Sequence, residues 1–167
     1  MKPRRYSQRP ELIQNGVSFR TWATNKTSVA VMLMNSDRQA IRELPMSLDQ
    51  EGYYYVEDRE AAAGMLYQYR LDGQLFPDPA SRFQPFGVHG PSQIVDGSHF
   101  VWSDQSWQRP SLSELIIYEL HVGTFTREGC FKSIIDHFDH LLRLGVNAIE
   151  IMPIADFPGD SNWVTTV

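Results

Sequence analysis

The hydrophobic pattern between Val17 and Leu75 constrains the fold of this chain more than any other feature. Apolar side chains recur there at every second position, and turn residues interrupt the pattern about every ten positions, as in β-sandwiches. The segments that fit are residues 17–22, 29–34, 41–44, 53–56 and 65–71. We expect these five segments to pair antiparallel and to form a β-sandwich.

Six aromatic residues in these segments allow two interpretations. A flat ring suits the apolar face of a sugar, and a phenol adds a hydrogen bond. Because side chains alternate along a strand, however, about half of the rings point into the core. We therefore favour core packing over sugar binding for any single ring. The residues are Trp22, Tyr53, Tyr54, Tyr55, Tyr67 and Tyr69.

A stretch rich in proline and glycine follows at residues 76–99 and has neither a strand nor a helix period. Long loops without secondary structure are usually functional or join two domains. Its phenylalanines favour packing against another surface over free flexibility. We place the sandwich domain and this linker at residues 1–100, and a second domain at residues 101–167.

A strand, a helix and a second strand are predicted in the second domain. The run Leu-Ile-Ile-Tyr-Glu-Leu at 115–120 is typical of a strand covered on both faces. Apolar residues at helical spacing from Phe131 to Leu142 predict one helix, and Gly145 suits its left-handed cap. Residues 146–152 predict a second buried strand. The two strands of such a unit are parallel, and the unit occurs both in doubly wound sheets and in eight-stranded barrels.

Several titratable residues of this unit are candidates for chemistry. Glu119 and Glu150 lie inside the expected strands, whereas barrel enzymes act at the C-terminal strand ends, so we interpret both as structural. His121 lies near such an end, where it either meets a ligand or packs. His137 and His140 have metal-ligand spacing, but they lie on the polar helix face without a third ligand. We expect no metal site and no cofactor.

Charge and cysteine content exclude several classes of function. The net charge is −5 and no basic stripe is present, which argues against a nucleic-acid partner. The basic N-terminal residues are not followed by an apolar run, so we expect neither a signal peptide nor a membrane span. Cys130 is the single cysteine, which fits a reducing compartment and predicts a cytoplasmic location.

Three separated motifs resemble those of one enzyme family. Residues 76–85 (Phe-Pro-Asp-Pro-Ala-Ser-Arg-Phe-Gln-Pro) and 87–92 (Gly-Val-His-Gly-Pro-Ser) are similar to the linker of maltooligosyltrehalose trehalohydrolases and their branching and debranching relatives. Residues 117–126 (Ile-Tyr-Glu-Leu-His-Val-Gly-Thr-Phe-Thr) resemble the first barrel strand of this α-amylase-type glycoside hydrolase family 13. Residues 144–153 (Leu-Gly-Val-Asn-Ala-Ile-Glu-Ile-Met-Pro) resemble its second strand.

This resemblance implies a fold and an activity. The fold is an Ig-like, early-set β-sandwich followed by an incomplete (β/α)8 TIM barrel that ends after its second strand. The activity is hydrolysis of the α-1,4 bond next to the trehalose end of maltooligosyltrehalose, which belongs to trehalose biosynthesis from α-glucan. The family mechanism is retaining and uses an Asp nucleophile, a Glu acid/base and a further Asp on later barrel strands.

No position of this chain corresponds to those three carboxylates, so we name no catalytic residue and expect the isolated chain to be inactive. His121 and Trp163 are candidate carbohydrate-binding residues, with α-glucan or maltooligosyltrehalose as the substrate of the full-length enzyme. After Trp163 the family pattern continues Gly-Tyr-Asp-Gly, whereas residues 164–167 here are Val-Thr-Thr-Val. A deletion, a frameshift or an early stop would explain this departure, so we expect a fragment.

Two alternatives remain open at this point. The chain could be a non-catalytic α-glucan-binding module that holds glucan through exposed tyrosines or tryptophans. It could also be a fragment of a glycogen-branching or debranching enzyme, because the linker motifs lie outside any active site.

Overall fold

The structure is a computed structural model that describes residues 4–98 and 100–154. The described residues form two compact units, of which the first ends at Val101 and the second begins at Trp102. The first unit is built from β-strands, and the second is a short βαβ-like segment.

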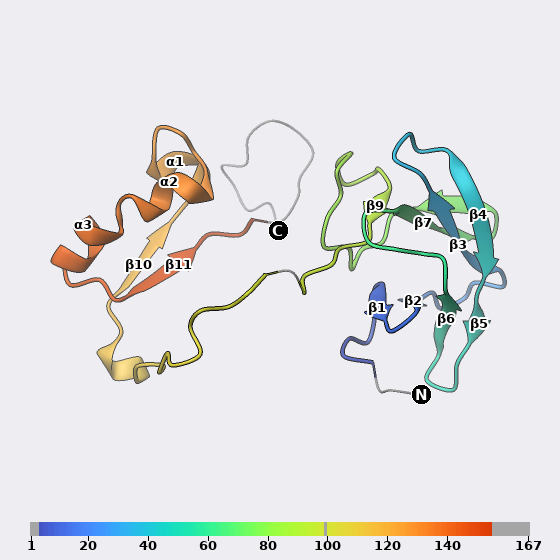
Figure 1. The fold of residues 1–167 in the computed structure, drawn as a ribbon, viewed down its shortest axis with the longest axis horizontal. Helices are drawn as coiled ribbons and strands as arrows, with labels where there is room; N and C mark the ends of the chain where they lie inside the picture. The colour runs from blue at the N-terminus through green and yellow to red at the C-terminus, as the bar shows by residue number, and fades with distance from the viewer. Residues whose placement is uncertain (1–3, 99, 155–167) are drawn as a thin grey trace. The chain divides into compact units, whose positions relative to one another are not determined.

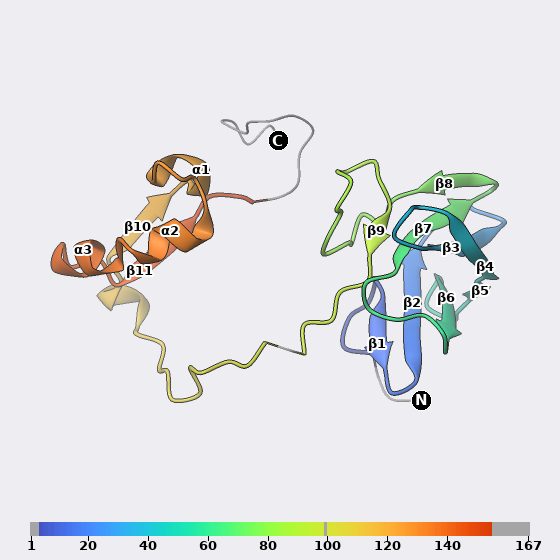
Figure 2. The same ribbon diagram turned by 45° about the horizontal axis from the view of Figure 1, so that its top comes forward.

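Two antiparallel sheets make up the first unit (Figures 1 and 2). Sheet A has the strand order β1-β2-β6-β5, and sheet B has the order β4-β3-β7-β8 with β9 also paired to β7. The strands of sheet A are β1 (Glu11–Ile13), β2 (Gly16–Trp22), β5 (Ser47–Leu48) and β6 (Tyr53–Asp58). Those of sheet B are β3 (Val29–Met34), β4 (Ala40–Pro45), β7 (Leu66–Leu71), β8 (Gln74–Phe76) and β9 (Ser92–Gln93).

The core lies between the two sheets. The odd-numbered side chains of β2 face those of β3 and β7, and the rings of Phe19 and Tyr67 meet edge-on at 5.7 Å. Burying each large side chain contributes about 1.5–3 kcal/mol relative to exposure. The most buried members are Val17, Phe19, Val31, Leu33, Tyr67 and Tyr69.

All five expected strands are present and pair antiparallel, so the prediction of a sandwich is confirmed. The strands β1, β5, β8 and β9 were not expected, because a strand of two or three residues is too short to show alternation. Strand β3 also departs from the pattern, since all six of its side chains are buried. Met32 and Met34 form a small apolar cluster with Leu66 on the outer face of sheet B.

The long loop after β8 folds back beside this outer face. The guanidinium of Arg38 lies 5.0 Å from the centre of the Phe86 ring, and residues 89–91 share a groove with Met34. The loop is therefore ordered against the sandwich, as its aromatic content predicts.

The second unit contains the parallel strands β10 (Ile117–Leu120) and β11 (Ala148–Ile151), which confirms the predicted order of strand, helix and strand. The 3-10 helix η1 (Leu112–Glu114) precedes them. Asn147 joins the starts of the two strands: its side chain accepts from the Ile116 amide at 2.7 Å and donates to the Glu114 carbonyl at 2.8 Å.

The prediction of one continuous helix between these strands is wrong. The structure has α2 (Phe131–Ile135) and α3 (Phe138–Arg143), and a further short helix, α1 (Val122–Phe125), directly after β10. At the break, the His137 amide donates to the Ile134 carbonyl in a tighter turn, and its ring packs edge-on against Phe125 at 5.5 Å. Within the described ranges, no helix has the length and apolar character needed to cross a membrane.

The predicted glycine cap is confirmed. Gly145 has a φ of +87°, its amide donates to the Leu142 carbonyl at 2.9 Å, and the Val146 amide donates to the Leu141 carbonyl at 3.1 Å. This is a Schellman motif, and its usual apolar contact is supplied by the buried side chains of Leu141 and Val146.

The expectation that both strands are covered on both faces is wrong for the described residues. Ile117 is 52% exposed and Ile151 is 40% exposed. The helices of a single crossover lie on one side of a parallel pair, so they provide cover for one face only.

Candidate functional site

A groove of about 560 Å³ lies on the outer face of sheet B. It is shallow and open to solvent over most of its extent, unlike the enclosed clefts that bury most of a small ligand. The register pairs Met32 with Gln68 and Arg70 with Leu75, so the even positions of β3 and β7 share this face with Leu75 of β8. The lining residues are Met34, Asp37, Arg38, Gln68, Leu75, His89, Gly90 and Pro91.

The turn between β3 and β4 presents two of the polar lining residues. The side-chain oxygen of Asn35 accepts hydrogen bonds from the amides of Asp37 at 3.1 Å and Gln39 at 2.9 Å. Arg38 adopts a left-handed φ of +63° within this turn. The turn therefore holds Asp37 and Arg38 at one end of the groove by its own hydrogen bonds.

The loop that closes the groove is fastened at its base by a buried network. The Tyr67 hydroxyl donates to the Asp78 carboxylate at 2.7 Å, and the Asp78 amide donates to the Ser92 hydroxyl at 3.2 Å. The Ala80 amide also donates to Asp78 at 2.8 Å. Because the chain leaves the sandwich at Asp78 and returns at Ser92, these bonds fix both ends of the segment that carries His89.

Burial dominates the electrostatics of this network. It raises the pKa of Asp78 above the ordinary aspartate value, while the hydrogen bond from Tyr67 opposes that shift. Burial, with the nearby Asp78 charge, raises the pKa of the Tyr67 phenol far above its ordinary value. Tyr67 therefore remains a hydrogen-bond donor throughout the physiological pH range.

The groove combines aliphatic surface with both donors and acceptors of hydrogen bonds. Met34 and Leu75 supply the apolar part, while Arg38 and Gln68 can donate and Asp37 can accept. The formal charges of Arg38 and Asp37 cancel. Such a lining suits a neutral ligand that has apolar faces and many hydroxyl groups better than it suits an anion.

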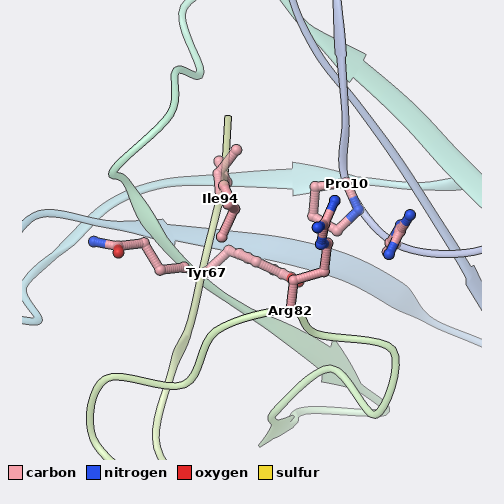
Figure 3. Close-up of a pocket in the computed structure, with 7 residues that line it drawn as sticks. Pro10, Tyr67, Arg82 and Ile94 are labelled. Atoms are coloured by element: carbon pink, nitrogen blue, oxygen red, sulfur yellow. The ribbon is translucent and has the colours of Figure 1, made fainter. Parts of the chain in front are cut away.

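A second hollow is too small for such a ligand. Tyr67, Arg82 and Ile94 line it together with Pro10 (Figure 3), and its volume is about 10 Å³. That space holds about one water molecule. It therefore excludes a sugar ring.

The sandwich aromatics divide into buried and exposed rings. Tyr67 and Tyr69 are 1% and 2% exposed, so the prediction of core packing is confirmed for them. Tyr54 is half-buried and its hydroxyl donates to the Lys26 carbonyl at 2.7 Å. Trp22, in contrast, is 48% exposed at the end of β2.

In the second unit, the candidate residues lie on and next to the parallel strand pair. His121 directly follows β10, is half-buried and precedes the first turn of α1; its contact with a sugar stays a prediction. Trp163 lies outside the described residues. Glu119 and Glu150 are register partners within β10 and β11, and both are exposed. The interpretation of the two as buried or half-buried structural carboxylates is therefore wrong for the described residues.

His137 and His140 are exposed on the short helical segment. Within residues 4–98 and 100–154, no three His, Cys, Asp or Glu side chains cluster as a metal would require.

Sequence reasoning missed the groove, although part of its signal was present. Alternation along β3 and β7 already placed Met34 and Gln68 on the face opposite the core. The Asp-Gly pair at 72–73 predicts a tight hairpin, which would have added Leu75 to that face. The position of His89 depends on the path of a long loop, for which the sequence offers no periodic signal.

Comparison with known proteins connects this fold to carbohydrate-active enzymes. Residues 6–83 match the family model of carbohydrate-binding module 48, the isoamylase N-terminal domain. A solved structure described as an α-amylase candidate from Salmonella typhimurium superposes with a TM-score of 0.81 at 35% identity, over 94% of this chain and 26% of that one. A pullulanase from Paenibacillus barengoltzii complexed with maltotriose superposes with a TM-score of 0.72 at 25% identity, over 88% and 27% of the two chains.

The chain thus corresponds to the N-terminal portion of a protein of glycoside hydrolase family 13, and its residues 6–83 match carbohydrate-binding module 48. Curated relatives indicate which group within family 13 the chain is similar to. A malto-oligosyltrehalose trehalohydrolase from Saccharolobus solfataricus is 43% identical over 154 residues, which are 92% of this chain and 26% of that protein. One from Deinococcus radiodurans is 37% identical over 148 residues, 89% of this chain and 24% of that protein.

Within family 13, the chain corresponds to the N-terminal region of the malto-oligosyltrehalose trehalohydrolases. It spans about a quarter of the length of these curated relatives.

Proposed function

We propose that this chain is the glucan-holding front part of a hydrolase that cleaves the α-1,4 bond next to the trehalose end of maltooligosyltrehalose. In this proposal the parallel β10 and β11 begin a (β/α)8 barrel, and the Ig-like sandwich precedes it. The supporting observation is that the 43% identity to a trehalohydrolase extends over 92% of the chain, and so includes the sandwich, the loop and the βαβ segment.

The structure supports a division of labour within such an enzyme. Glu119 and Glu150 are each followed by one more strand residue, so neither lies beyond a C-terminal strand end, where barrel enzymes place catalytic groups. The described residues therefore bind and position glucan in this proposal, and the cleaving carboxylates belong to later barrel strands. We further propose that His121, which directly follows β10, contacts the substrate in the full-length enzyme.

The hydrolase part of the proposal is tested by reading the gene beyond the Trp163 codon. An in-frame Gly-Tyr-Asp-Gly, followed by an Asp, a Glu and an Asp on later barrel strands, would support it. The product of that longer frame is expected to release trehalose from maltooligosyltrehalose and to leave pullulan intact. Cleavage of pullulan without release of trehalose would instead assign the protein to the debranching enzymes.

The binding part of the proposal places an α-glucan chain in the groove on sheet B. Its aliphatic walls would contact the apolar faces of glucose units, and Arg38 and Gln68 would donate to the hydroxyl groups. The 167-residue chain should therefore bind maltotetraose, and Leu75→Glu should weaken that binding at least about tenfold by adding a charge to the apolar wall.

A matched control is Ile41→Glu, which adds the same charge on β4 at a side chain that is 55% exposed and outside the groove lining. Isothermal titration of both variants measures the difference. Equal affinity of wild type and Leu75→Glu for maltotetraose would remove the groove from the proposal.

A second candidate function, a binding module that acts without a catalytic domain, is favoured by the match of residues 6–83 to carbohydrate-binding module 48. It predicts retardation of the chain on amylose gels together with a genuine stop codon after Val167. The cytoplasm is the proposed compartment in either case, on the basis of the single, exposed thiol of Cys130; cell fractionation tests it.

A further inference from the structure

Trp22 lies on the outer face of sheet A, the face of the sandwich that does not carry the groove. It is the register partner of Tyr53 on β6, and the two rings meet edge-on with their centres 4.8 Å apart. Although the rings pack together, Trp22 remains 48% exposed. An indole that is packed on one side and open on the other presents a flat apolar surface to solvent.

The turn between β5 and β6 holds this ring in a defined position. The Asp49 carboxylate accepts hydrogen bonds from the amides of Glu51 and Tyr53, both at 2.9 Å. Gly52 follows with a φ of +86°, and a Cβ added there would lie 3.3 Å from the Trp22 ring. The indole therefore packs directly on backbone where a side chain would crowd it, so its orientation is fixed before any ligand arrives.

Charged groups lie beside the Tyr53 ring without leaving a net positive site there. Arg20 donates to Asp49 at 2.9 Å and 2.6 Å and to Glu51 at 2.6 Å, and its guanidinium lies 3.8 Å from the centre of the Tyr53 ring. One cation thus faces two carboxylates. The side chain of Glu51 is 74% exposed, so its carboxylate can accept further hydrogen bonds from a ligand.

We propose that Trp22, Tyr53 and Glu51 form a second carbohydrate-binding site, on sheet A, which stacks one glucose unit of an α-1,4-glucan. The indole face packs against the apolar face of the sugar ring, and Glu51 accepts from its hydroxyl groups. The excess of carboxylate over guanidinium disfavours phosphate-bearing ligands and favours a neutral polyol. This inference rests on the proposed glucan-binding function, but it concerns a different face of the sandwich.

The test is a titration of the ¹⁵N-labelled 167-residue chain with maltotetraose, followed by NMR. The Trp22 indole N–H and the Tyr53 amide report on sheet A, and the Leu75 amide reports on the groove. All three signals should shift. Trp22→Ala should weaken the response of Tyr53 at least about tenfold, the scale on which interfaces lose a tryptophan anchor, and should leave the response of Leu75 unchanged.

Two further variants separate stacking from loss of fold. Trp22→Tyr keeps a flat ring and should retain the affinity measured at Tyr53 within about threefold, because its apolar area and ring geometry are largely preserved. Trp107→Ala removes a tryptophan of the second unit that is 66% exposed and should change neither response.

The outcomes for the two sites are distinguishable. If Leu75 shifts while the Trp22 indole and Tyr53 do not, the second site is refuted and the groove stands. If the Trp22 indole and Tyr53 signals shift while the Leu75 signal does not, the second site is supported and binding in the groove is refuted. Equal responses of Tyr53 in wild type and Trp22→Ala would also refute the inference.

Discussion

Replacing Tyr67 with phenylalanine removes one oxygen atom from the core and leaves the Asp78 carboxylate without the donor that lies 2.7 Å away. Asp78 is 2% exposed, so water does not readily replace that donor. A hydrogen bond to a charged group contributes about 1.5–3 kcal/mol to stability. At pH 7 we expect Tyr67→Phe to lower the free energy of unfolding by about this amount, and a loss of about 2 kcal/mol corresponds to about 8–16 °C in Tm for a domain of this size.

The same substitution should change how stability depends on pH. The pKa of Asp78 is raised in the folded state. The contribution of this group to the free energy of unfolding is therefore present below the ordinary aspartate pKa and declines as the pH rises through the folded pKa. Tyr67→Phe removes a donor that favours the carboxylate, so that pKa rises further. The cost should therefore decrease as the pH falls through the folded pKa of Asp78, because a bond to the neutral carboxyl group is worth only about 0.5–1.5 kcal/mol.

Urea unfolding followed by near-ultraviolet circular dichroism at pH 4 and pH 7 measures both effects. Tyr55→Phe is the matched control, because Tyr55 is half-buried on β6 and its hydroxyl makes no hydrogen bond within the described residues; it should change stability by less than about 0.5 kcal/mol. The reasoning is refuted if Tyr67→Phe lowers the free energy of unfolding equally at the two pH values, or by no more than Tyr55→Phe does.

Three further substitutions test other parts of the structure. Gly16→Ala should cost at least about 2 kcal/mol in urea unfolding, because the new Cβ would lie 2.0 Å from a backbone carbonyl oxygen of β6 at a φ of +116°. Leu141→Ala should cost about 2–5 kcal/mol and reduce amide protection in the second unit, since its side chain is 3% exposed. Hydrogen bonds from the amides of Ser28 and Thr27 lower the pKa of Asp72, so its stabilisation is lost as the pH falls through that lowered value. Acid titration of Asp72→Asn should accordingly show a flatter loss of stability below about pH 4 than wild type.

The sequence predicts the sandwich well because its longer strands have one face against the core. Val17 and Phe19 on β2, and Tyr67 and Tyr69 on β7, alternate as a half-buried strand requires. The pattern fails on β3, where Met34 is 6% exposed on the outer face. Met34 packs there with Met32 and Leu66 and shares a groove with residues 89–91, and local alternation contains no information about such contacts.

The helical region of the second unit shows a similar limit. The spacing of its apolar residues describes a continuous stripe, yet the chain turns at Asp136 and His137, so that Ile134 and Leu141 are buried while Phe138 remains 42% exposed. A contact between the rings of His137 and Phe125 accompanies the break. The candidate site is harder still to predict, because the groove draws on three strands, a turn and a distant loop.

The hydrogen bonds from Tyr67 to Asp78 and from Asp78 to Ser92 hold the two ends of the loop that forms one wall of the groove. Because the two ends of the intervening segment are held together, its middle can lengthen or change composition with little effect on the sandwich; each doubling of a flexible loop adds only about 0.6 kcal/mol of closure entropy. Residues around His89 are therefore free to diversify, whereas Tyr67, Asp78 and Ser92 are not. Insertions between residues 84 and 89 offer a way to reshape the groove without redesigning the scaffold.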